Sequence, residues 1–275
     1  MSEKNNRLQT TPDSSVFLDT SLPNVARIFD YLAGGSANFE SDRQATAQIL
    51  QIIPSLGKWV RLRRAFVQEA TRQLHQAGFR QFLDLGSGMP SEDHIHAFAP
   101  DAHIVYSDIN PVAVRYGQSL FADQENIQYI QGNVREIDKI LYSSEVRACL
   151  NPQERIAIGL NGLLLFFSEE DNRQLAHQLY QWASPGSKIF VVFQTRGDKE
   201  IPQAYDDFFQ LARSAGLPIQ LYTLQKCISL MAPWQIEDVI PIVQFLGLPE
   251  DFISAEDQAG IQLAFYAAFV TKQLG

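Results

Sequence analysis

The chain is poor in cysteine, and its two cysteines, Cys149 and Cys227, are far apart in the sequence. This spacing supports neither a disulfide framework nor a zinc site, so we expect no metal and a reducing, cytoplasmic compartment. No apolar run reaches the ~18 residues of a membrane span, and residues 1–15 lack the apolar core of a signal peptide. We therefore expect no membrane partner.

Positive charge is also scarce. The 275 residues include 22 Lys and Arg against 31 Asp and Glu, which gives a net charge of −9. A nucleic-acid-binding protein usually presents a basic face, so we expect no nucleic-acid partner. The chain has one basic cluster, which we interpret as a solvated helix face: Lys58, Arg61, Arg63 and Arg64. The oligomeric state stays open between monomer and homodimer.

Apolar patterning divides the chain into three parts. Residues 1–15 are polar and predict a disordered tail. Residues 16–78 predict an N-terminal helical cap, and residues 79–275 predict one α/β domain. The helices expected in the cap are bounded by Pro23, Gly34 and Pro54, and they span 25–32, 42–53 and 59–77.

From residue 80 onward, short apolar strands alternate with helical segments. This alternation predicts a mostly parallel sheet with crossover helices. The expected strands are 81–85, 103–107, 127–131, 155–160, 188–193, 219–223 and 262–271. The expected helices are 91–98, 111–121, 134–142, 169–183, 199–215 and 233–246.

The most informative segment follows the first expected strand and reads Asp84-Leu-Gly86-Ser-Gly88, and the second expected strand is followed by Asp108. Glycines let a ligand approach the backbone at a strand-to-helix turn, and an acidic residue after the next strand accepts ribose hydroxyl groups. This layout predicts a nucleotide-type ligand site. The alternatives are an ordinary turn that needs positive φ and helix caps at the two carboxylates.

Two classes of nucleotide ligand fit this layout. A dinucleotide site needs a third glycine at position 91 and free N–H groups at the helix start, but the chain has Pro90 and Ser91 there. The Asp-x-Gly-x-Gly form is instead similar to motif I of the class I S-adenosylmethionine (SAM)-dependent methyltransferases. A nicotinamide-dependent oxidoreductase is therefore the less favoured alternative.

Residues 23–43 read Pro-Asn-Val-Ala-Arg-Ile-Phe-Asp-Tyr-Leu-Ala-Gly-Gly-Ser-Ala-Asn-Phe-Glu-Ser-Asp-Arg. This segment resembles the signature of a bacterial family of SAM-dependent methyltransferases once catalogued as a domain of unknown function. Segments 64–66, 78–86 and 102–108 match the family as well. The resemblance implies SAM as cofactor. It also implies a Rossmann-like class I sheet of seven strands, whose last strand is antiparallel and lies between the fifth and sixth.

The resemblance also implies contacts with the cofactor. Asp84 would face the methionine ammonium group, Asp108 the ribose hydroxyls, and Asn133 with the next N–H the adenine. Arg27, or alternatively Arg64, would pair with the methionine carboxylate. The full set of expected cofactor-binding residues is Arg27, Tyr31, Gly35, Arg64, Asp84, Gly86, Gly88, Asp108, Ile109, Asn133, Val134 and Asn161. In the structural alternative, Arg27 and Tyr31 only line the polar edge of a packing helix.

No general base stands out in the sequence. The candidates for a catalytic role are Tyr31, Asn161 and His94, although each also fits a packing or turn position. A sulfonium methyl group is a strong electrophile, so alignment of an acceptor in a dry site can supply most of the rate. We expect a small or medium organic acceptor, because Asn161-Gly-Leu-Leu stands where DNA methyltransferases carry (Asp/Asn/Ser)-Pro-Pro-(Tyr/Phe).

Two further alternatives stay open. A non-enzymatic SAM-binding or scaffold protein would also show motif I without a clear base. An aminopropyltransferase shares the same sheet, but it would lack an arginine that binds the cofactor's carboxylate.

Overall fold

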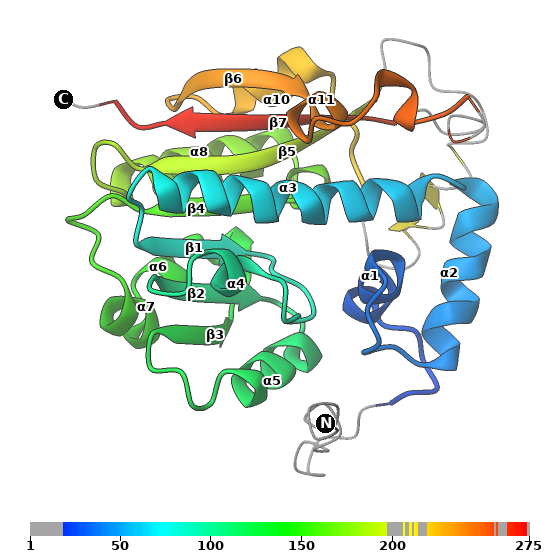
Figure 1. Ribbon diagram of the computed structural model, residues 1–275, viewed down its shortest axis with the longest axis horizontal. Helices are drawn as coiled ribbons and strands as arrows, with labels where there is room; N and C mark the ends of the chain where they lie inside the picture. Colours follow the sequence, from blue (N-terminus) through cyan, green and yellow to red (C-terminus); the bar gives the residue numbers. More distant parts are fainter. Residues whose placement is uncertain are drawn as a thin grey trace.

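The computed structural model describes residues 19–196, 206, 209–210, 212–213, 219–255, 257 and 263–273. Its centre is a seven-stranded sheet with the strand order β3-β2-β1-β4-β5-β7-β6 (Figure 1). Strands β1 to β5 run parallel to their neighbours among these five, and β7 runs antiparallel to β5 and β6. The strands are β1 (Gln81–Leu85), β2 (His103–Asp108), β3 (Ile127–Gln131), β4 (Ala157–Asn161), β5 (Lys188–Arg196), β6 (Gln235–Pro241) and β7 (Leu263–Thr271).

The predicted sheet is confirmed, including the antiparallel last strand between the fifth and sixth. The location of the sixth strand was wrong. Segment 219–223 contributes only one isolated bridge, between Tyr222 and Thr195. The sixth strand comes instead from within 233–246, which the sequence predicted to be a helix, because residues 235–241 pair with β7. Long-range pairing overrides the local apolar spacing at this position.

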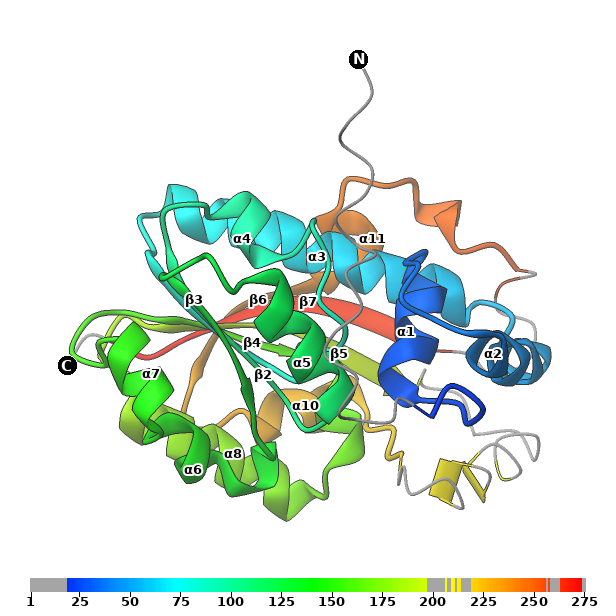
Figure 2. The same cartoon turned by 90° about the horizontal axis from the view of Figure 1, so that it is seen from below.

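Helices cover both faces of the sheet and give three layers (Figure 2). One core is built with α3 (Leu56–Gln76), α4 (Ile95–Phe98), α5 (Pro111–Leu120) and α11 (Ile242–Phe245). The other is built with α6 (Ile137–Leu141), α7 (Ser144–Cys149), α8 (Glu169–Trp182) and α10 (Leu224–Leu230). Short 3₁₀ turns are η1 (Val134–Glu136), η2 (Leu164–Phe166) and η3 (Glu250–Phe252).

Several helix predictions need correction. The helix expected over 91–98 starts only at Ile95, because His94 has an extended backbone with φ −91° and ψ −167°. The helix expected over 134–142 is split into η1 and α6.

Helices α7 and α10 were not predicted. Each begins at a side-chain cap, where Ser143 accepts from the Val146 N–H and Thr223 accepts from the Lys226 N–H. Residues 1–15, and most of the helix expected over 199–215, lie outside the described residues.

Helix α3 has 21 residues and connects the N-terminal region to the sheet. Trp59, Leu62, Phe66 and Ala70 recur at helical spacing, and the last two are fully buried. Its first turns extend past the carboxyl ends of the strands and meet α2 there (Figure 1). The same helix therefore packs on the sheet and covers the strand tips.

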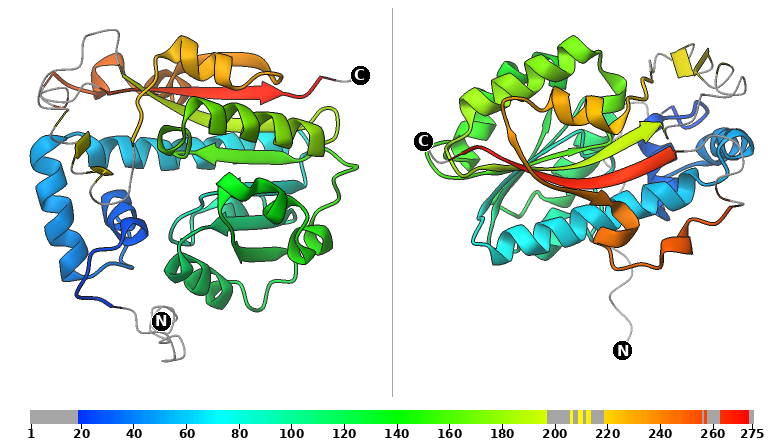
Figure 3. Two further views of the ribbon diagram at one scale, coloured as in Figure 1. Left: turned by 180° about the vertical axis from the view of Figure 1, so that it is seen from behind. Right: turned by 90° about the horizontal axis from the view of Figure 1, so that it is seen from above.

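Helices α1 (Val25–Ala33) and α2 (Glu40–Ile52) lie beside the carboxyl ends of the parallel strands (Figures 1 and 3). Helix α1 begins because the Asn24 side chain accepts from the N–H groups of Ala26 and Arg27. It ends at Gly34, whose φ of 89° closes the helix as the sequence predicted.

A fully buried carboxylate, that of Asp42, joins α1 to α2. It accepts hydrogen bonds from the Asn24 N–H at 2.8 Å, the Phe39 N–H at 2.8 Å and Arg27 Nε at 2.7 Å. The Arg27 side chain is itself only 2% exposed. This buried ion pair fixes the angle between the two cap helices.

We predict that Asp42→Ala lowers the free energy of unfolding by about 3–5 kcal/mol, because it leaves the Arg27 charge buried without a counter-charge. Glu40→Ala is the matched control. It breaks the exposed pair between Glu40 and Arg43 in the same helix and should cost under about 1 kcal/mol. Urea denaturation of both variants measures the difference, and equal losses would contradict the structural role of Asp42.

Candidate functional site

The turn after β1 depends on two glycines. Gly86 and Gly88 have left-handed backbones with φ of 69° and 71°, which other residues rarely adopt. A Cβ on Gly86 would lie 2.5 Å from the Leu163 side chain, whereas a Cβ on Gly88 would meet nothing within 4 Å. The Gly86 N–H and the Ser87 N–H both donate to the Ser107 carbonyl of β2, at 2.7 and 3.0 Å. The turn is thus fixed to the sheet and leaves open space beside Gly88.

The carboxylate at the end of β2 holds this turn in place. Asp108 Oδ2 accepts from the Gly88 N–H at 2.8 Å, and Oδ1 accepts from the Asn110 N–H at 2.8 Å. Helix α5 is capped by the Asn110 side chain, so the alternative that Asp108 is its cap is wrong. Each Asp108 oxygen keeps a second lone pair with which it can bind a ligand.

A cavity of about 710 Å³ lies at the carboxyl ends of the parallel strands, within the usual size range for small-molecule sites. Helices α1 and α3 form one side, and the segments that follow β1, β2, β3 and β4 form the other. Ten of the residues selected from the sequence line it: Arg64, Asp84, Gly86, Gly88, His94, Asp108, Ile109, Asn133, Val134 and Asn161.

Asp84 is a buried carboxylate that lies against β4. A Cβ on Gly159 would come within 2.2 Å of Asp84 Oδ1, so β4 needs a glycine there. Burial raises the pKa of Asp84 to about 7, and the nearby Asp108 charge acts in the same direction. Burial also raises the pKa of Asp108. Within the described residues, neither carboxylate forms an ion pair with Lys or Arg. Two buried carboxylates in this state favour a cationic ligand.

His94 lies next to Asp84, with its Nε2 3.8 Å from Asp84 Oδ2. Its ring packs edge-on against Tyr106, with 4.9 Å between ring centroids. Burial lowers the pKa of His94 to about 3, so its imidazole is neutral at physiological pH. Its Nδ1 is buried and has no hydrogen-bond partner among the described residues.

Arg63 is a cavity residue that the sequence analysis assigned to a solvated face. Its guanidinium lies over the Phe29 ring, 5.2 Å from the centroid, and its Nη1 would be 2.1 Å from a Cβ on Gly162. In the described part of the chain it forms no ion pair or hydrogen bond. Burial lowers the pKa of Arg63 to about 10, against the opposing effect of Asp84, so it stays charged. It is therefore a free cation beside a buried carboxylate.

The sequence carries one signal for Arg63, which can be used once the side of α3 that faces the strand tips is known. Val60, Arg63 and Val67 recur at helical spacing, so the arginine shares a stripe with apolar residues, and all three line the cavity. The neighbouring Arg64 also lines the cavity, but it pairs with Asp93 through Nε and Oδ2 at 3.1 Å. Of the two arginines, Arg63 is the one available to a ligand.

The tips of β2 and β3 present the expected adenine-side residues to the cavity. Asn133 Oδ1 accepts from the Arg135 N–H at 3.1 Å and caps η1. Val134 is buried, whereas Ile109 is 60% exposed. The apolar side chain of Ile109 therefore lies at the rim of the cavity.

Asn161 ends β4, the strand beside β1. Its Nδ2 donates to the Phe190 carbonyl at 3.5 Å. Its Oδ1 is buried and has no hydrogen-bond partner in the described part of the chain. Asn161 therefore presents an unused acceptor atom next to the turn after β1.

Three of the residues expected to contact the cofactor do not line the cavity. Arg27 is engaged with Asp42 inside the cap, which leaves its guanidinium committed to the fold. Tyr31 is 40% exposed. Gly35 packs against Asp30, where a Cβ would lie 2.0 Å from Oδ1, so it serves the loop after α1.

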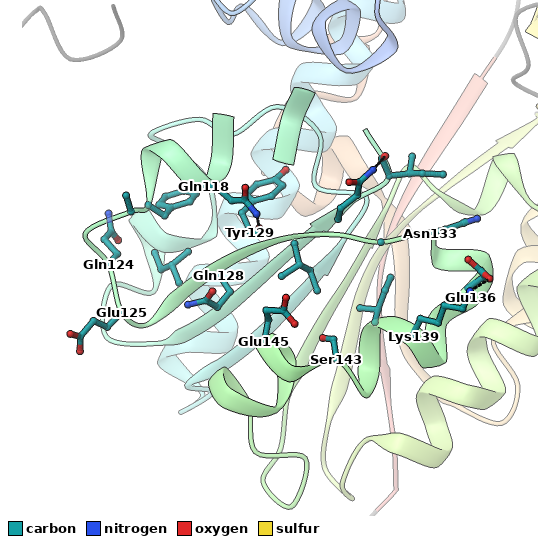
Figure 4. A pocket seen from close by; sticks show the side chains of 18 residues that line it. Gln118, Gln124, Glu125, Gln128, Tyr129, Asn133, Glu136, Lys139, Ser143 and Glu145 are labelled. Atoms are coloured by element: carbon teal, nitrogen blue, oxygen red, sulfur yellow. Dashed lines mark hydrogen bonds and ion pairs between the residues drawn. The ribbon is translucent and has the colours of Figure 1, made fainter. Parts of the chain in front are cut away.

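A second cavity of about 680 Å³ lies along the edge strand β3 (Figure 4). It shares Ile109, Gly132 and Asn133 with the first cavity, but it contains neither Asp84 nor the glycine turn. Its lining carries amide and charged side chains such as Gln128 and Glu145. The sequence motifs meet in the first cavity, which we therefore take as the functional site.

Two other features are missing from the described ranges. They contain no group of three His, Cys, Asp or Glu side chains placed to hold a metal ion. No helix in these ranges is long and apolar enough to cross a membrane.

The chain matches the model of the S-adenosyl methyltransferase family over residues 11–245. The search of curated protein sequences gives no match. Solved structures are similar over nearly the full length. A Thermobifida fusca YX protein solved as a candidate methyltransferase has a TM-score of 0.80 at 28% identity, covering 93% of this chain and 97% of that one.

More distant structures share the fold. A DUF574 family protein from Streptomyces avermitilis MA-4680 gives a TM-score of 0.79 at 23% identity, over 92% of this chain and 99% of that one. Phosphoethanolamine N-methyltransferase 2 of Haemonchus contortus, solved with SAM, gives 0.54 at 12% identity, over 75% of this chain and 52% of that one.

We predict that Asp84→Asn stabilises the ligand-free protein at pH 8, on the order of 2 kcal/mol. The folded-state pKa of Asp84 is raised from 3.8 to about 7. The protonated Asp84 side chain fits its buried place. Its contribution to stability is therefore complete below pH 3.8, and it is lost as the pH rises through 7 and the folded protein must bury the charged form. The gain should shrink toward pH 4. Urea unfolding at both values tests this, with the exposed Asp123→Asn as control, and a pH-independent difference would argue against the burial effect.

Proposed function

Because the chain belongs to the S-adenosyl methyltransferase family, we propose that its 710 Å³ cavity binds SAM and a small or medium organic acceptor together. The observation that carries this proposal is the pair of buried carboxylates, Asp84 and Asp108, on either side of the glycine turn. SAM carries a sulfonium and an ammonium group, so it brings positive charge to two buried carboxylates whose charge the nearby Arg63 offsets only in part.

The methionine part of SAM is a zwitterion, and the cavity contains one residue for each of its charges. Asp84 faces the ammonium group, as the sequence analysis expected. Arg63 takes the carboxylate, because its guanidinium lies close enough to influence Asp84 and is free of other ion pairs. This assignment replaces Arg27 and is preferred to Arg64, whose guanidinium already pairs with Asp93.

The adenosine part extends along the tips of β2 and β3. Asp108 accepts from the ribose hydroxyls with its remaining lone pairs, and Gly88 leaves room for the sugar. Asn133 and the Val134 N–H bind the adenine edge, with Ile109 against the ring. The fixed turn keeps these groups in place before the ligand arrives, which lowers the entropy cost of binding.

The reaction needs alignment more than acid–base chemistry. When bound, SAM supplies an electrophilic methyl group. The protein holds the acceptor in line with it between the tip of β4 and the cap helices, and Phe29, Phe166 and Leu163 exclude water from that space. The net charge of −9 makes a polyanionic nucleic acid an unfavourable acceptor.

Two measurements test the proposed function. Calorimetry should detect binding of S-adenosylhomocysteine, and a labelled-SAM screen should detect methyl transfer to small organic molecules. A folded protein that binds S-adenosylhomocysteine but transfers no methyl group would favour the scaffold alternative. One that binds NADH in preference would favour the oxidoreductase.

We predict that Asp108→Ala weakens binding of S-adenosylhomocysteine by about 1.5–3 kcal/mol, because charge-assisted hydrogen bonds to the ribose are lost. Asp108→Asn keeps one acceptor oxygen for a backbone N–H group, so it should reduce the affinity for S-adenosylhomocysteine less. Calorimetry of variants whose thermal melts show a folded protein measures both. Unchanged affinity in folded Asp108→Ala would refute the ribose assignment.

Arg63→Ala should weaken binding of S-adenosylhomocysteine by about 1.5–3 kcal/mol, the usual range for a hydrogen bond to a charged group. Binding of methylthioadenosine, which lacks the amino acid part, should not change. Arg61→Ala is the matched control on the same helix, because Arg61 is exposed and contacts the Leu32 carbonyl. Equal losses for both ligands would show that Arg63 shapes the cavity without binding the carboxylate.

A further inference from the structure

Two residues that line the cavity each have a buried polar atom without a hydrogen-bond partner among the described residues: Asn161 with its Oδ1 and His94 with its Nδ1. Asn161 ends β4 and is followed by Gly162 and Leu163, and the Leu163 side chain lies against the glycine turn. Asn161 therefore lies at the strand tip where the proposed acceptor is held. The inference drawn from this atom rests on the proposed function, since it concerns the acceptor of the same site.

The orientation of the Asn161 amide is set by its neighbour. The Phe190 carbonyl can only accept a hydrogen bond, so the NH₂ group of Asn161 faces it, at 3.5 Å. The amide oxygen is therefore the atom left for the cavity. A buried acceptor without a donor is costly, so this oxygen selects a ligand that presents N–H or O–H.

No described group at the cavity is left free to remove a proton from a hydroxyl acceptor at neutral pH. Asp30, which lines the cavity, accepts from Asn38 Nδ2 at 3.1 Å, and Asp108 binds the ribose in the proposed complex. An amide oxygen does not take up a proton under these conditions, and the His94 imidazole is a weak base because burial lowers its pKa to about 3. Asp84 faces the methionine ammonium in the proposed complex. A neutral amine needs no base, since its nitrogen has a free lone pair while its N–H still donates.

The charge next to Asn161 also acts on the protonation state of an amine acceptor. The Arg63 guanidinium lies against Gly162, the next residue in the chain. A positive charge there opposes protonation of a nearby amine, so the reactive neutral form is favoured.

We propose that the acceptor is a small organic amine that is methylated on nitrogen, with Asn161 Oδ1 accepting a hydrogen bond from its N–H. The nitrogen lone pair forms the new bond to the methyl carbon. The sulfur–methyl bond breaks, its electron pair returns to sulfur, and neutral S-adenosylhomocysteine leaves. The methylated ammonium then releases its proton to water. Asn161 is a catalytic residue in this step, because its hydrogen bond strengthens as positive charge develops on the nitrogen.

The test uses the full-length protein, labelled SAM and probes that share one carbon skeleton: benzylamine, benzyl alcohol, benzyl mercaptan and benzoic acid. Hexylamine and hexanol form a second, aliphatic pair. Mass spectrometry locates the added methyl group. We expect transfer to an amine nitrogen and none to the oxygen or sulfur of the matched probes.

The variant Asn161→Leu keeps the side-chain size but removes the acceptor atom. It should lower kcat for the amine roughly 10- to 100-fold, the range expected for a hydrogen bond to a charged group, with a smaller effect on the affinity for S-adenosylhomocysteine. Asn161→Ala provides a second variant should the leucine form not fold. Asn151→Leu is the control, because Asn151 is exposed and precedes the same strand at its opposite end.

Three results would overturn the inference. They are methylation only of oxygen or sulfur, transfer to no amine by a protein that binds S-adenosylhomocysteine, and an Asn161→Leu variant that loses cofactor affinity without a change in kcat. Failure to bind S-adenosylhomocysteine at all would instead contradict the proposed function. The two failures are thus distinguishable.

Discussion

The site depends on the burial of two negative charges at neighbouring strand tips. Asp84 and Asp108 are 4% and 8% exposed, and the described residues offer neither of them an ion pair with Lys or Arg. This arrangement opposes folding, since a desolvated carboxylate is unfavourable, and the Arg63 charge offsets the effect at Asp84 only in part. A cationic ligand removes this penalty when it binds. The same buried carboxylates that lower the folding stability of the ligand-free protein therefore raise its affinity for the ligand. Hydrogen bonds from the glycine turn to Ser107 and Asp108 maintain the arrangement.

The N-terminal signature builds the wall of the site more than it contacts the ligand. Arg27, Asp42 and Gly35 are all signature residues, and the structure uses them to brace α1, α2 and the loop between them. Asn24, at a variable position of the same segment, accepts from the Asn110 side chain at 2.8 Å and so connects the cap to the segment after β2. In this chain, the segment that resembles the family signature therefore supports the fold of the cap.

Local patterns predicted most of the parallel sheet, because each of β1 to β5 is an apolar run with its own boundary residues. They failed at β6, where pairing with β7 decides the structure. In the site, Asp84, Gly86, Gly88 and Asp108 could be found from their spacing. Arg63 could not be separated from its basic neighbours without knowing which side of α3 faces the strand tips, and Gly159 gave no signal until the Asp84 carboxylate was placed against it.

The central claim is that the buried Asp84 carboxylate forms an ion pair with the ammonium group of the ligand. Its pKa of about 7 in the free protein implies that it is partly protonated near neutral pH. Calorimetric titration with S-adenosylhomocysteine at pH 7, in buffers of different ionisation enthalpy, measures proton exchange on binding. We expect release of a fraction of one proton, abolished by Asp84→Asn. Binding with no proton release in the unmodified protein would contradict the account.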